Sequence, residues 1–364
     1  MMKIGLLSLH KNANYGWVLQ CYALLSILKS LGHDVTYIDK VDFVEKKKKV
    51  IIKSQIKTFL RLILGKKKVN SNINPFFLKY ITPRTSEIRS IKGLDKLQHF
   101  DAVIVGSDQV WRPLYVHPIE NYYLDFVKNS ACKKISYAAS FGTDKAEYSA
   151  SEIQICGNLL KLFHAVSIRE SSAIGLIRDV YRWQTVPLVH VLDPTLLLCQ
   201  ADYDKLIGDS DSVAFNGNLF CYLLDMTSEK GSIVRKLESD LQKKAYSIQL
   251  NTSTMPSVEN WLKAFKDADF VFTDSYHGCI FSIIFRKPFI VMGNRSRGLA
   301  RFTSLLEMFG LMDLMIESSQ ELTSTRIDRC LSIDWIEVEE CIAKYQNISI
   351  TFLKTALDLS LIHI

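Results

Sequence analysis

Residues 268–285 read ADFVFTDSYHGCIFSIIF, which contains a complete strand–turn–helix unit. The apolar run near 269–273 predicts a buried strand, and the apolar segment over 277–286 predicts a helix. The polar turn between them is typical of a loop that leaves the end of a buried strand. This unit predicts an α/β fold with parallel strands.

The same alternation of short apolar runs and longer helical patterns recurs along most of the chain. Before Asp193-Pro194 we expect strands near 3–8, 34–39, 101–106, 133–139, 164–168 and 189–192, and helices near 16–31, 50–64, 150–162 and 170–181. After it we expect strands near 219–225, 245–250, 269–273 and 288–292, and helices near 229–243, 257–267, 277–286, 301–309 and 335–358.

We therefore predict the fold class α/β, with two Rossmann-like parallel-sheet domains that face each other across a cleft. The predicted parts are an N-terminal domain over 1–195 with a basic insertion near 45–70, a C-terminal domain over 196–330, and a C-terminal helix over 331–364. A chain of 364 residues with 48% hydrophobic and 23% charged side chains is large enough for two cores.

Positive charge is concentrated in the segment Lys46–Lys68, where basic residues alternate with apolar ones. Such a segment can lie on an anionic membrane, so a peripheral contact at the inner face of the membrane is one interpretation. A solvated helix that covers its own domain is the other. We expect no nucleic-acid partner, because the sequence shows neither a recognisable nucleic-acid module nor a basic surface with stacking aromatics.

The eight cysteines include no CxxC pair and show no Cys/His spacing of a zinc site, so we expect reduced cysteines and no metal. The N-terminus lacks the pattern of a signal peptide. No apolar run approaches the roughly 18 residues of a spanning helix. These features favour a cytoplasmic protein.

The first predicted strand leads through Asn14-Tyr15-Gly16 directly into a helix that contains Gln20. Unpaired N–H groups and the positive end of the helix dipole suit a phosphate or a carboxylate, and Gly16 permits close approach of a ligand to the backbone. The alternative is an ordinary strand–helix turn, since a single glycine is a weak signal.

Two further polar clusters follow predicted strands. Ser107 and Asp108 end the strand near 101–106, and Asp108 is a candidate base or, alternatively, a helix N-cap. Arg169 ends the strand near 164–168, where its guanidinium could bind a carboxylate or phosphate at the cleft. The alternative for Arg169 is a structural ion pair with Glu170 or another acid.

His277 lies at the start of the helix in the opening stretch, where the dipole favours a neutral imidazole that can donate and accept protons. The alternative is a histidine satisfied by Asp274 that serves only packing. Beyond the next strand, three arginines fall within seven residues, and we rank Arg301 first as an anion ligand because a helix should fix its geometry.

Several ordered stretches over roughly residues 3–310 together resemble the polysaccharide pyruvyl transferase family. They are Asn14-Tyr15-Gly16 with Leu19-Gln20, Val105-Gly106-Ser107-Asp108-Gln109-Val110-Trp111, Ser167-Ile168-Arg169-Glu170, Leu192-Asp193-Pro194-Thr195 and Thr273-Asp274-Ser275-Tyr276-His277-Gly278. The resemblance implies a glycosyltransferase-B-like fold, phosphoenolpyruvate as co-substrate with no other cofactor, and a sugar diol as acceptor. The implied activity is pyruvyl ketal formation in bacterial capsular, exopolysaccharide or cell-wall glycans.

Many members of that family carry an arginine two residues before the motif histidine, whereas this chain has Ser275 there. We therefore assign donor binding to Arg169 and Arg301. His277 is predicted to be the principal acid/base and Asp108 to accept or orient the acceptor proton. The remaining predicted substrate-binding residues are Asn14, Gly16, Gln20, Ser107, Ser275 and Tyr276.

Two alternatives to a pyruvyl transferase remain at this point, because fold alone does not determine function. One is a glycosyltransferase that uses a nucleotide-sugar donor on the same scaffold. The other is a non-catalytic component of a glycan-assembly complex that docks through its basic segment. A lipid-linked oligosaccharide acceptor would also give that segment a purpose.

Overall fold

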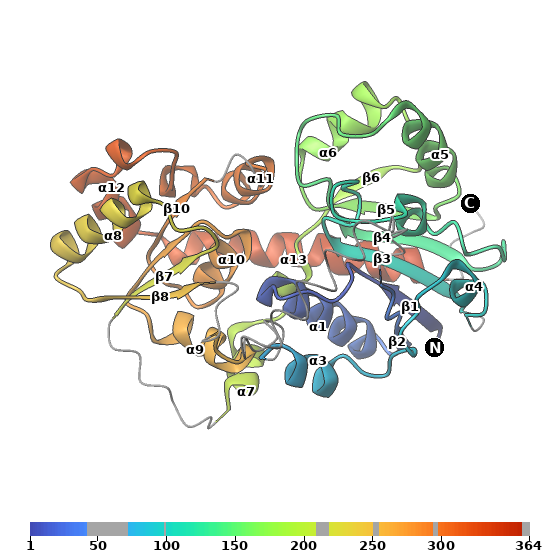
Figure 1. The fold of residues 1–364 in the computed structure, drawn as a ribbon, viewed down its shortest axis with the longest axis horizontal. Helices are drawn as coiled ribbons and strands as arrows, with labels where there is room; N and C mark the ends of the chain where they lie inside the picture. The colour runs from blue at the N-terminus through green and yellow to red at the C-terminus, as the bar shows by residue number, and fades with distance from the viewer. Residues whose placement is uncertain (42–71, 98–99, 209–217, 250–254, 294–297, 359–364) are drawn as a thin grey trace, which may run out of the picture.

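A computed structural model describes residues 1–41, 72–97, 100–208, 218–249, 255–293 and 298–358. The basic segment Lys46–Lys68 and the helix predicted near 50–64 lie outside these described residues. Two lobes, each built on its own parallel sheet, lie side by side (Figure 1).

The first lobe contains a six-stranded sheet in the order β2-β1-β3-β4-β5-β6. Every pairing in it is parallel. Its two longest strands, β3 and β4, are buried along their whole length because helices cover both faces, which explains their continuous apolar sequences. The strands are β1 (Lys3–Leu7), β2 (Asp34–Tyr37), β3 (Ala102–Asp108), β4 (Lys133–Ala139), β5 (Ala165–Ile168) and β6 (Leu188–His190).

Side-chain caps define where the main helices of the first lobe begin. Asn14 caps α1, and Ser149 with Glu152 forms a capping box at the start of α5. The helices of this lobe are α1 (Tyr15–Ser30), α3 (Asn74–Tyr80), α4 (Ile91–Leu94), η1 (Ile119–Tyr123), α5 (Ala150–Leu160), α6 (Ser172–Gly175) and η2 (Leu176–Val180).

The second lobe contains a five-stranded parallel sheet in the order β11-β10-β9-β7-β8. Its strands are β7 (Leu219–Leu223), β8 (Ala245–Gln249), β9 (Phe270–Thr273), β10 (Phe289–Met292) and β11 (Met315–Ile316). The helices that follow β6 are η3 (Pro194–Leu197), α7 (Gln200–Ile207), α8 (Ser228–Leu241), α9 (Val258–Asp267), α10 (Tyr276–Ile284), α11 (Ala300–Met308), η5 (Met312–Leu314), η6 (Ser319–Glu321) and α12 (Ser324–Leu331).

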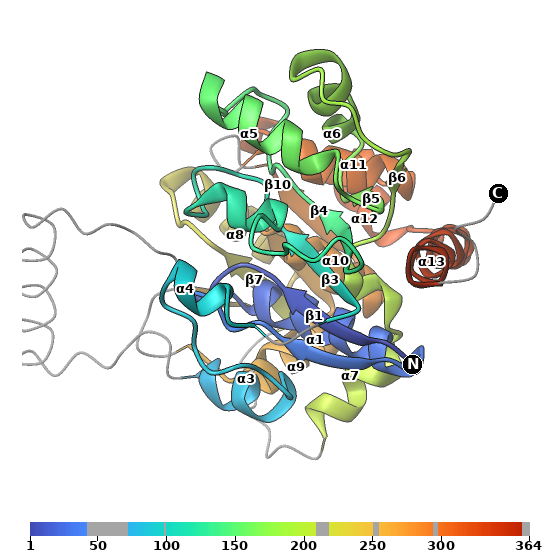
Figure 2. The same ribbon diagram turned by 90° about the vertical axis from the view of Figure 1, so that its right-hand side faces the viewer.

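The last helix, α13 (Trp335–Leu357), begins beside the second lobe and ends against the first (Figure 1). Figure 2 shows it end-on at one side of the molecule. Its C-terminal half packs on β4, where Lys133 Nζ donates to the carbonyls of Ala356 and Asp358 at 3.1 and 2.7 Å. Ser349 Oγ on the same helix accepts the Leu192 N–H at 3.0 Å. The helix thus joins the two lobes.

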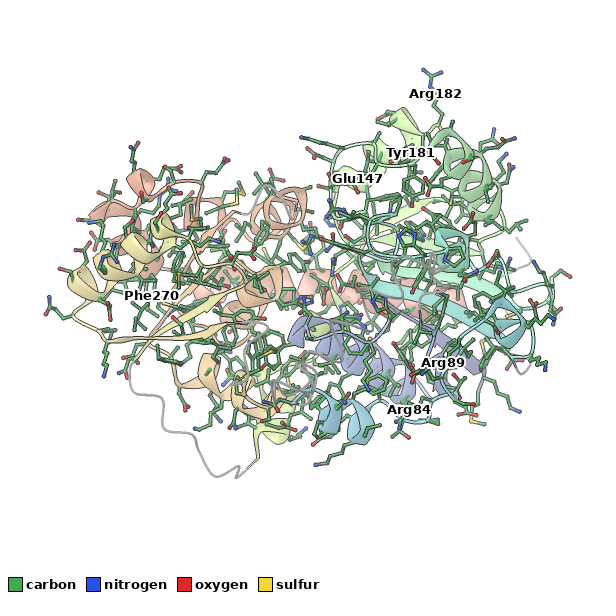
Figure 3. All side chains as sticks on the ribbon, viewed as in Figure 1. Arg84, Arg89, Glu147, Tyr181, Arg182 and Phe270 are labelled. Atoms are coloured by element: carbon green, nitrogen blue, oxygen red, sulfur yellow. The ribbon has the colours of Figure 1, made fainter. Side chains whose placement is uncertain are left out.

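Side chains also connect the lobes directly. Tyr15, at the start of α1, donates its hydroxyl to the carbonyl of Pro256 at 2.7 Å, and its ring stacks on Trp261 with centroids 5.0 Å apart. The Ser171 N–H donates to Ser304 Oγ at 3.0 Å on the opposite side of the interface. Figure 3 shows that side chains fill the space between the ribbons in both lobes.

The predicted fold class is confirmed: both halves are parallel α/β units. The helix predicted over 170–181 is instead a short α-helical turn, α6, followed by the π-helical turn η2. The elements that were not predicted from the sequence are α3, α4, η1, η3, α7, η5, β11, η6 and α12.

Candidate functional site

A cavity of about 270 Å³ opens where the carboxyl ends of the two sheets face each other. Loops after β1, β3, β7 and β9 supply most of its wall, as expected for ligand sites of parallel sheets. The lining from the first lobe is Leu9, His10, Asn12, Asn14, Asp108, Gln109 and Tyr115, and the lining from the second is Leu224, Asp274, Ser275, Tyr276, His277, Arg301 and Phe302.

The turn between β9 and α10 has little freedom. Thr273 Oγ1 accepts the Ser275 N–H at 3.1 Å, and Ser275 Oγ in turn accepts the Gly278 N–H at 3.3 Å. A Cβ on Gly278 would lie 2.2 Å from Thr273 Oγ1, so glycine is needed there. The turn therefore fixes the backbone of His277 at the first turn of α10.

His277 is buried between the two lobes, with 5% of its surface exposed. Its Nε2 lies 3.6 Å from Asp193 Oδ2, which is longer than a hydrogen bond. On the other side, a Cβ on Gly16 would lie 2.0 Å from Nδ1. The imidazole thus fits only because residue 16 is glycine.

The alternative from the sequence was that Asp274 pairs with His277. Asp274 instead has other partners. Asp274 Oδ2 accepts Lys230 Nζ at 2.6 Å, and its Oδ1 accepts the Leu224 N–H at 2.6 Å. Asp274 therefore ties the loop after β7 to the turn after β9. Lys230, in α8, is the buried counter-ion in this arrangement.

Arg169 lies beneath the cavity and does not line it. Its Nη1 donates to Asp193 Oδ2 at 2.8 Å and its Nη2 to Asp108 Oδ1 at 3.1 Å. Burial alone would raise the pKa of Asp193, but His277 and Arg169 together hold it well below the ordinary value. Burial alone would lower the pKa of Arg169, yet Tyr276 and the neighbouring carboxylates raise it overall.

Asp108 ends β3 in a left-handed backbone conformation, with φ of 74°. No helix follows it, so it is not a helix N-cap; its Oδ1 accepts the N–H of the next residue, Gln109, at 2.9 Å. The other oxygen, Oδ2, makes no hydrogen bond to the residues that the structure describes, and Asp108 lines the cavity. This oxygen is available to a ligand.

The two arginines that were predicted to bind the donor both lie close to the ring of Tyr276. The guanidinium carbon of Arg169 lies 4.7 Å from the centroid of its ring, and that of Arg301 lies 5.4 Å away. Arg301 lines the cavity at the start of α11. Burial and then the charge of Arg169 lower the pKa of Arg301.

The other predicted residues fall into two groups. Asn14 and Ser275 line the cavity, yet both are N-caps, and Asn14 Oδ1 accepts the Gly16 N–H at 2.8 Å. The expected free amide of Gly16 is therefore already paired. Gln20 and Ser107 are fully buried behind the cavity, where Gln20 Oε1 accepts the Ser107 N–H at 3.0 Å. They support the end of β3 that carries Asp108.

No role was predicted from the sequence for Asp193, Gln109, Tyr115 or Lys230. Asp193 lies in Leu192-Asp193-Pro194-Thr195, one of the stretches that resemble the family, and this was the signal that could have identified it. Its pairing with His277 spans lobes and has no local signature. Among the residues that the structure describes, no group of three or more His, Cys, Asp or Glu side chains could hold a metal ion.

The polysaccharide pyruvyl transferase model matches residues 14–296, which is most of the chain and includes every residue of the Asp108–Arg169–Asp193–His277 network. The chain belongs to the polysaccharide pyruvyl transferase family. It is therefore an enzyme of that family. A search of curated proteins gave no significant match.

Solved structures similar to this pyruvyl transferase share its fold at low sequence identity. UDP-N-acetylglucosamine 2-epimerase from Rickettsia bellii has a TM-score of 0.54 and 9% identity, over 98% of this chain and 99% of that one. An alpha-glucosyltransferase in complex with UDP has a TM-score of 0.50 and 8% identity, over 99% and 97%. The pyruvyl transferase thus has the predicted glycosyltransferase-B-like architecture.

In this pyruvyl transferase, the hydroxyl of Ser275 caps α10. The cationic side chain nearest to that turn in the cavity lining is Arg301. Within the described part of the chain, no helix is both long and apolar enough to cross a membrane.

Proposed function

We propose that this enzyme transfers the pyruvyl group of phosphoenolpyruvate to two hydroxyls of one sugar in a bacterial surface glycan, forming a cyclic ketal. The observation that carries the proposal is that His277, Arg301 and Asp108 line one cavity, with the Asp193 carboxylate behind His277. This arrangement combines an anion-binding cation with two groups able to move protons.

The donor carries a phosphate and a carboxylate, so its site needs positive charge. Arg301 lines the cavity and is the residue we assign to one of these anions. We assign Arg169 to the positioning of Asp108 and Asp193 and not to donor binding, because its Nη atoms already bind those carboxylates.

His277 is the group we assign to proton transfer. Asp193 faces Nε2, and an acidic partner of this kind favours the tautomer with the proton on Nε2 and the lone pair on Nδ1. The Asp108, Arg169 and Asp193 cluster carries one net negative charge, so a proton accepted by His277 makes the buried set neutral. The cluster thus stabilises the protonated imidazole during turnover.

The reaction balances with one acid and one base. The donor methylene carbon takes a proton and becomes a methyl group, while the adjacent carbon forms a bond to the first sugar oxygen. The bond from that carbon to the phosphate oxygen then breaks, and the second sugar oxygen takes its place. Of the two hydroxyl protons, one is matched by the new methyl proton and the other leaves with phosphate. We assign the acceptance of a hydroxyl proton to Asp108 Oδ2, because Asp108 lines the cavity.

The first experiment is a thermal-shift titration of the purified enzyme with phosphoenolpyruvate, with UDP-sugars in parallel. A ligand that binds only the native state raises stability by RT ln(1 + [L]/Kd). We expect a shift with phosphoenolpyruvate. A shift with UDP-sugars alone would replace the proposal with the nucleotide-sugar alternative.

The second experiment changes His277 to Ala and Asp108 to Asn separately. Each change should lower turnover by about 10²–10⁴-fold, the usual contribution of a positioned acid or base. The exposed His164, outside the cavity lining, provides the matched His164→Ala control, which should turn over like the wild type. Undiminished turnover in both site variants, with the fold intact, would contradict the assignment.

A further inference from the structure

Arg112 connects two cavity-lining side chains to the interior of the first lobe. Its Nε and Nη2 donate to the Glu147 carboxylate at 2.9 and 2.8 Å, and Nη1 donates to Gln109 Oε1 at 3.2 Å. Its guanidinium carbon lies 5.0 Å from the centroid of the Tyr115 ring. Figure 3 shows Glu147 beside Tyr181, whose hydroxyl accepts the Glu147 N–H at 3.2 Å.

This arrangement fixes which end of the Gln109 amide faces the cavity. Arginine has only donors, so the atom bound to Arg112 must be the amide oxygen. Gln109 is 8% exposed, and a Cβ on Gly142 would lie 1.8 Å from that oxygen, so the amide is closely packed. Its Nε2 makes no hydrogen bond within the described part of the chain. Its two N–H donors therefore remain for a ligand.

Tyr115 provides a different kind of surface. Its half-buried ring lines the cavity, and the cation of Arg112 lies over it. An aromatic ring of this kind offers a flat apolar surface with a polar hydroxyl at its edge. A sugar ring has the complementary form, with a face of C–H groups and a rim of hydroxyls.

The two sides of the cavity also differ in charge. Among its described lining residues, the second lobe contributes the cation of Arg301 and the carboxylate of Asp274, and Lys230 neutralises that carboxylate. The first lobe contributes the Asp108 carboxylate, amides, His10 and Tyr115. An anionic donor fits the second-lobe side, whereas a neutral polyhydroxyl compound fits the first.

The geometry points to a subsite for the sugar ring of the acceptor, formed by Tyr115 and Gln109 and held in shape by Arg112. Tyr115 packs against the C–H face of the sugar, and Gln109 Nε2 donates to one of its hydroxyls. Asp108, next to Gln109, then lies on the side of the sugar hydroxyl that reacts. The inference rests on the proposed function for the identity of the acceptor, but the subsite can be tested without turnover.

The test is saturation-transfer difference NMR on the full chain, with p-nitrophenyl galactoside, glucoside and N-acetylmannosaminide as probes. Wild type and Tyr115→Phe should give signals from the sugar ring protons. Tyr115→Ala and Gln109→Leu should each weaken binding by about tenfold, the effect of losing one good contact of this size. Tyr345→Ala is the matched control, because Tyr345 is also half-buried beneath a lysine and does not line the cavity.

The outcomes separate this inference from the proposed function. Equal sugar signals in wild type, Tyr115→Ala and Gln109→Leu would overturn the subsite. So would the absence of sugar signals from wild type with every probe. Thermal shifts with phosphoenolpyruvate should be the same in wild type and Tyr115→Ala, which also shows that the variant folds. If sugars bind through Tyr115 while phosphoenolpyruvate gives no shift, the donor assignment fails and the subsite stands.

Discussion

Arg169, on the floor of the cavity, and Arg301, on its second-lobe wall, both place a guanidinium over the ring of Tyr276. The floor arginine is buried and binds two carboxylates; burial alone would lower its pKa, but Tyr276 and these carboxylates raise it overall. The wall arginine lines the cavity, and burial with the neighbouring Arg169 charge lowers its pKa. The charge of Arg169 is paired inside the protein, whereas Arg301 lies in the cavity wall.

The comparison shows that two arginines with the same predicted role can be separated by what surrounds them. A buried cation that is paired on both sides maintains structure, and its loss leaves uncompensated charges. A cation on a cavity wall gains most when an anion arrives. Substitutions at each position should therefore affect different measurements.

The largest effect is expected from Arg169→Met. The change leaves Asp108 and Asp193 buried without their counter-ion, which should cost about 3–5 kcal/mol of unfolding free energy. Urea unfolding measures it. The control is Arg329→Met, which removes a surface pair with Asp313 and should cost about 0–1 kcal/mol. Equal losses of unfolding free energy in Arg169→Met and Arg329→Met would contradict the structural role of Arg169.

The next effect is expected from Gly16→Ala, which tests whether glycine at position 16 is needed to hold the His277 ring in place. The new Cβ would overlap Nδ1 of His277 and displace the ring. A shift of this size should lower turnover by about 10²-fold. Gly231→Ala, in α8, is the control because its Cβ would meet only ordinary van der Waals contact. Wild-type turnover in Gly16→Ala would mean that His277 needs no exact placement.

A smaller effect is expected from Arg301→Met, and it should appear in binding. Loss of a charge-assisted contact should weaken phosphoenolpyruvate binding by about 10–100-fold. Thermal-shift titration measures the affinity, and urea unfolding should show a smaller loss of stability than in Arg169→Met. An unchanged affinity for phosphoenolpyruvate would show that Arg301 does not bind the donor anions.

The smallest effect concerns pH. The folded-state pKa of Asp193 is lowered, so its carboxylate contributes stability above the unfolded pKa of about 3.9 and loses that contribution as pH falls further. The difference in unfolding free energy between wild type and Asp193→Asn should therefore be constant near neutrality and shrink below about pH 4. A difference that grows on acidification would contradict the sign of the shift.

Most of the fold could be predicted because parallel strands buried on both faces read as short continuous apolar runs. The unpredicted elements are short or lack a clear period: β11 has two residues, and α3 begins with a proline in its first turn. The prediction of one continuous helix over 170–181 was wrong. An apolar period does not distinguish such a helix from a short α-helix followed by a turn of π-helix.

The candidate site was only partly predictable. Position after a strand was enough to select Asp108, His277 and Arg301, which line the cavity. The partners of Arg169 are 61 and 24 residues away in sequence, and no local pattern identifies them. The orientation of Gln109 likewise depends on Arg112 and Glu147, which a single strand-end motif does not contain.

The course of α13 has a mechanical consequence. The chain crosses from the first lobe to the second after β6 and returns through α13, so two separate crossings join the lobes (Figure 1). Direct contacts between Tyr15 and Pro256 and between Ser171 and Ser304 add to these two crossings. Movement of one lobe against the other would have to break these contacts as well as bend the chain at both crossings. The width of the cavity is therefore set by residues that lie outside its lining.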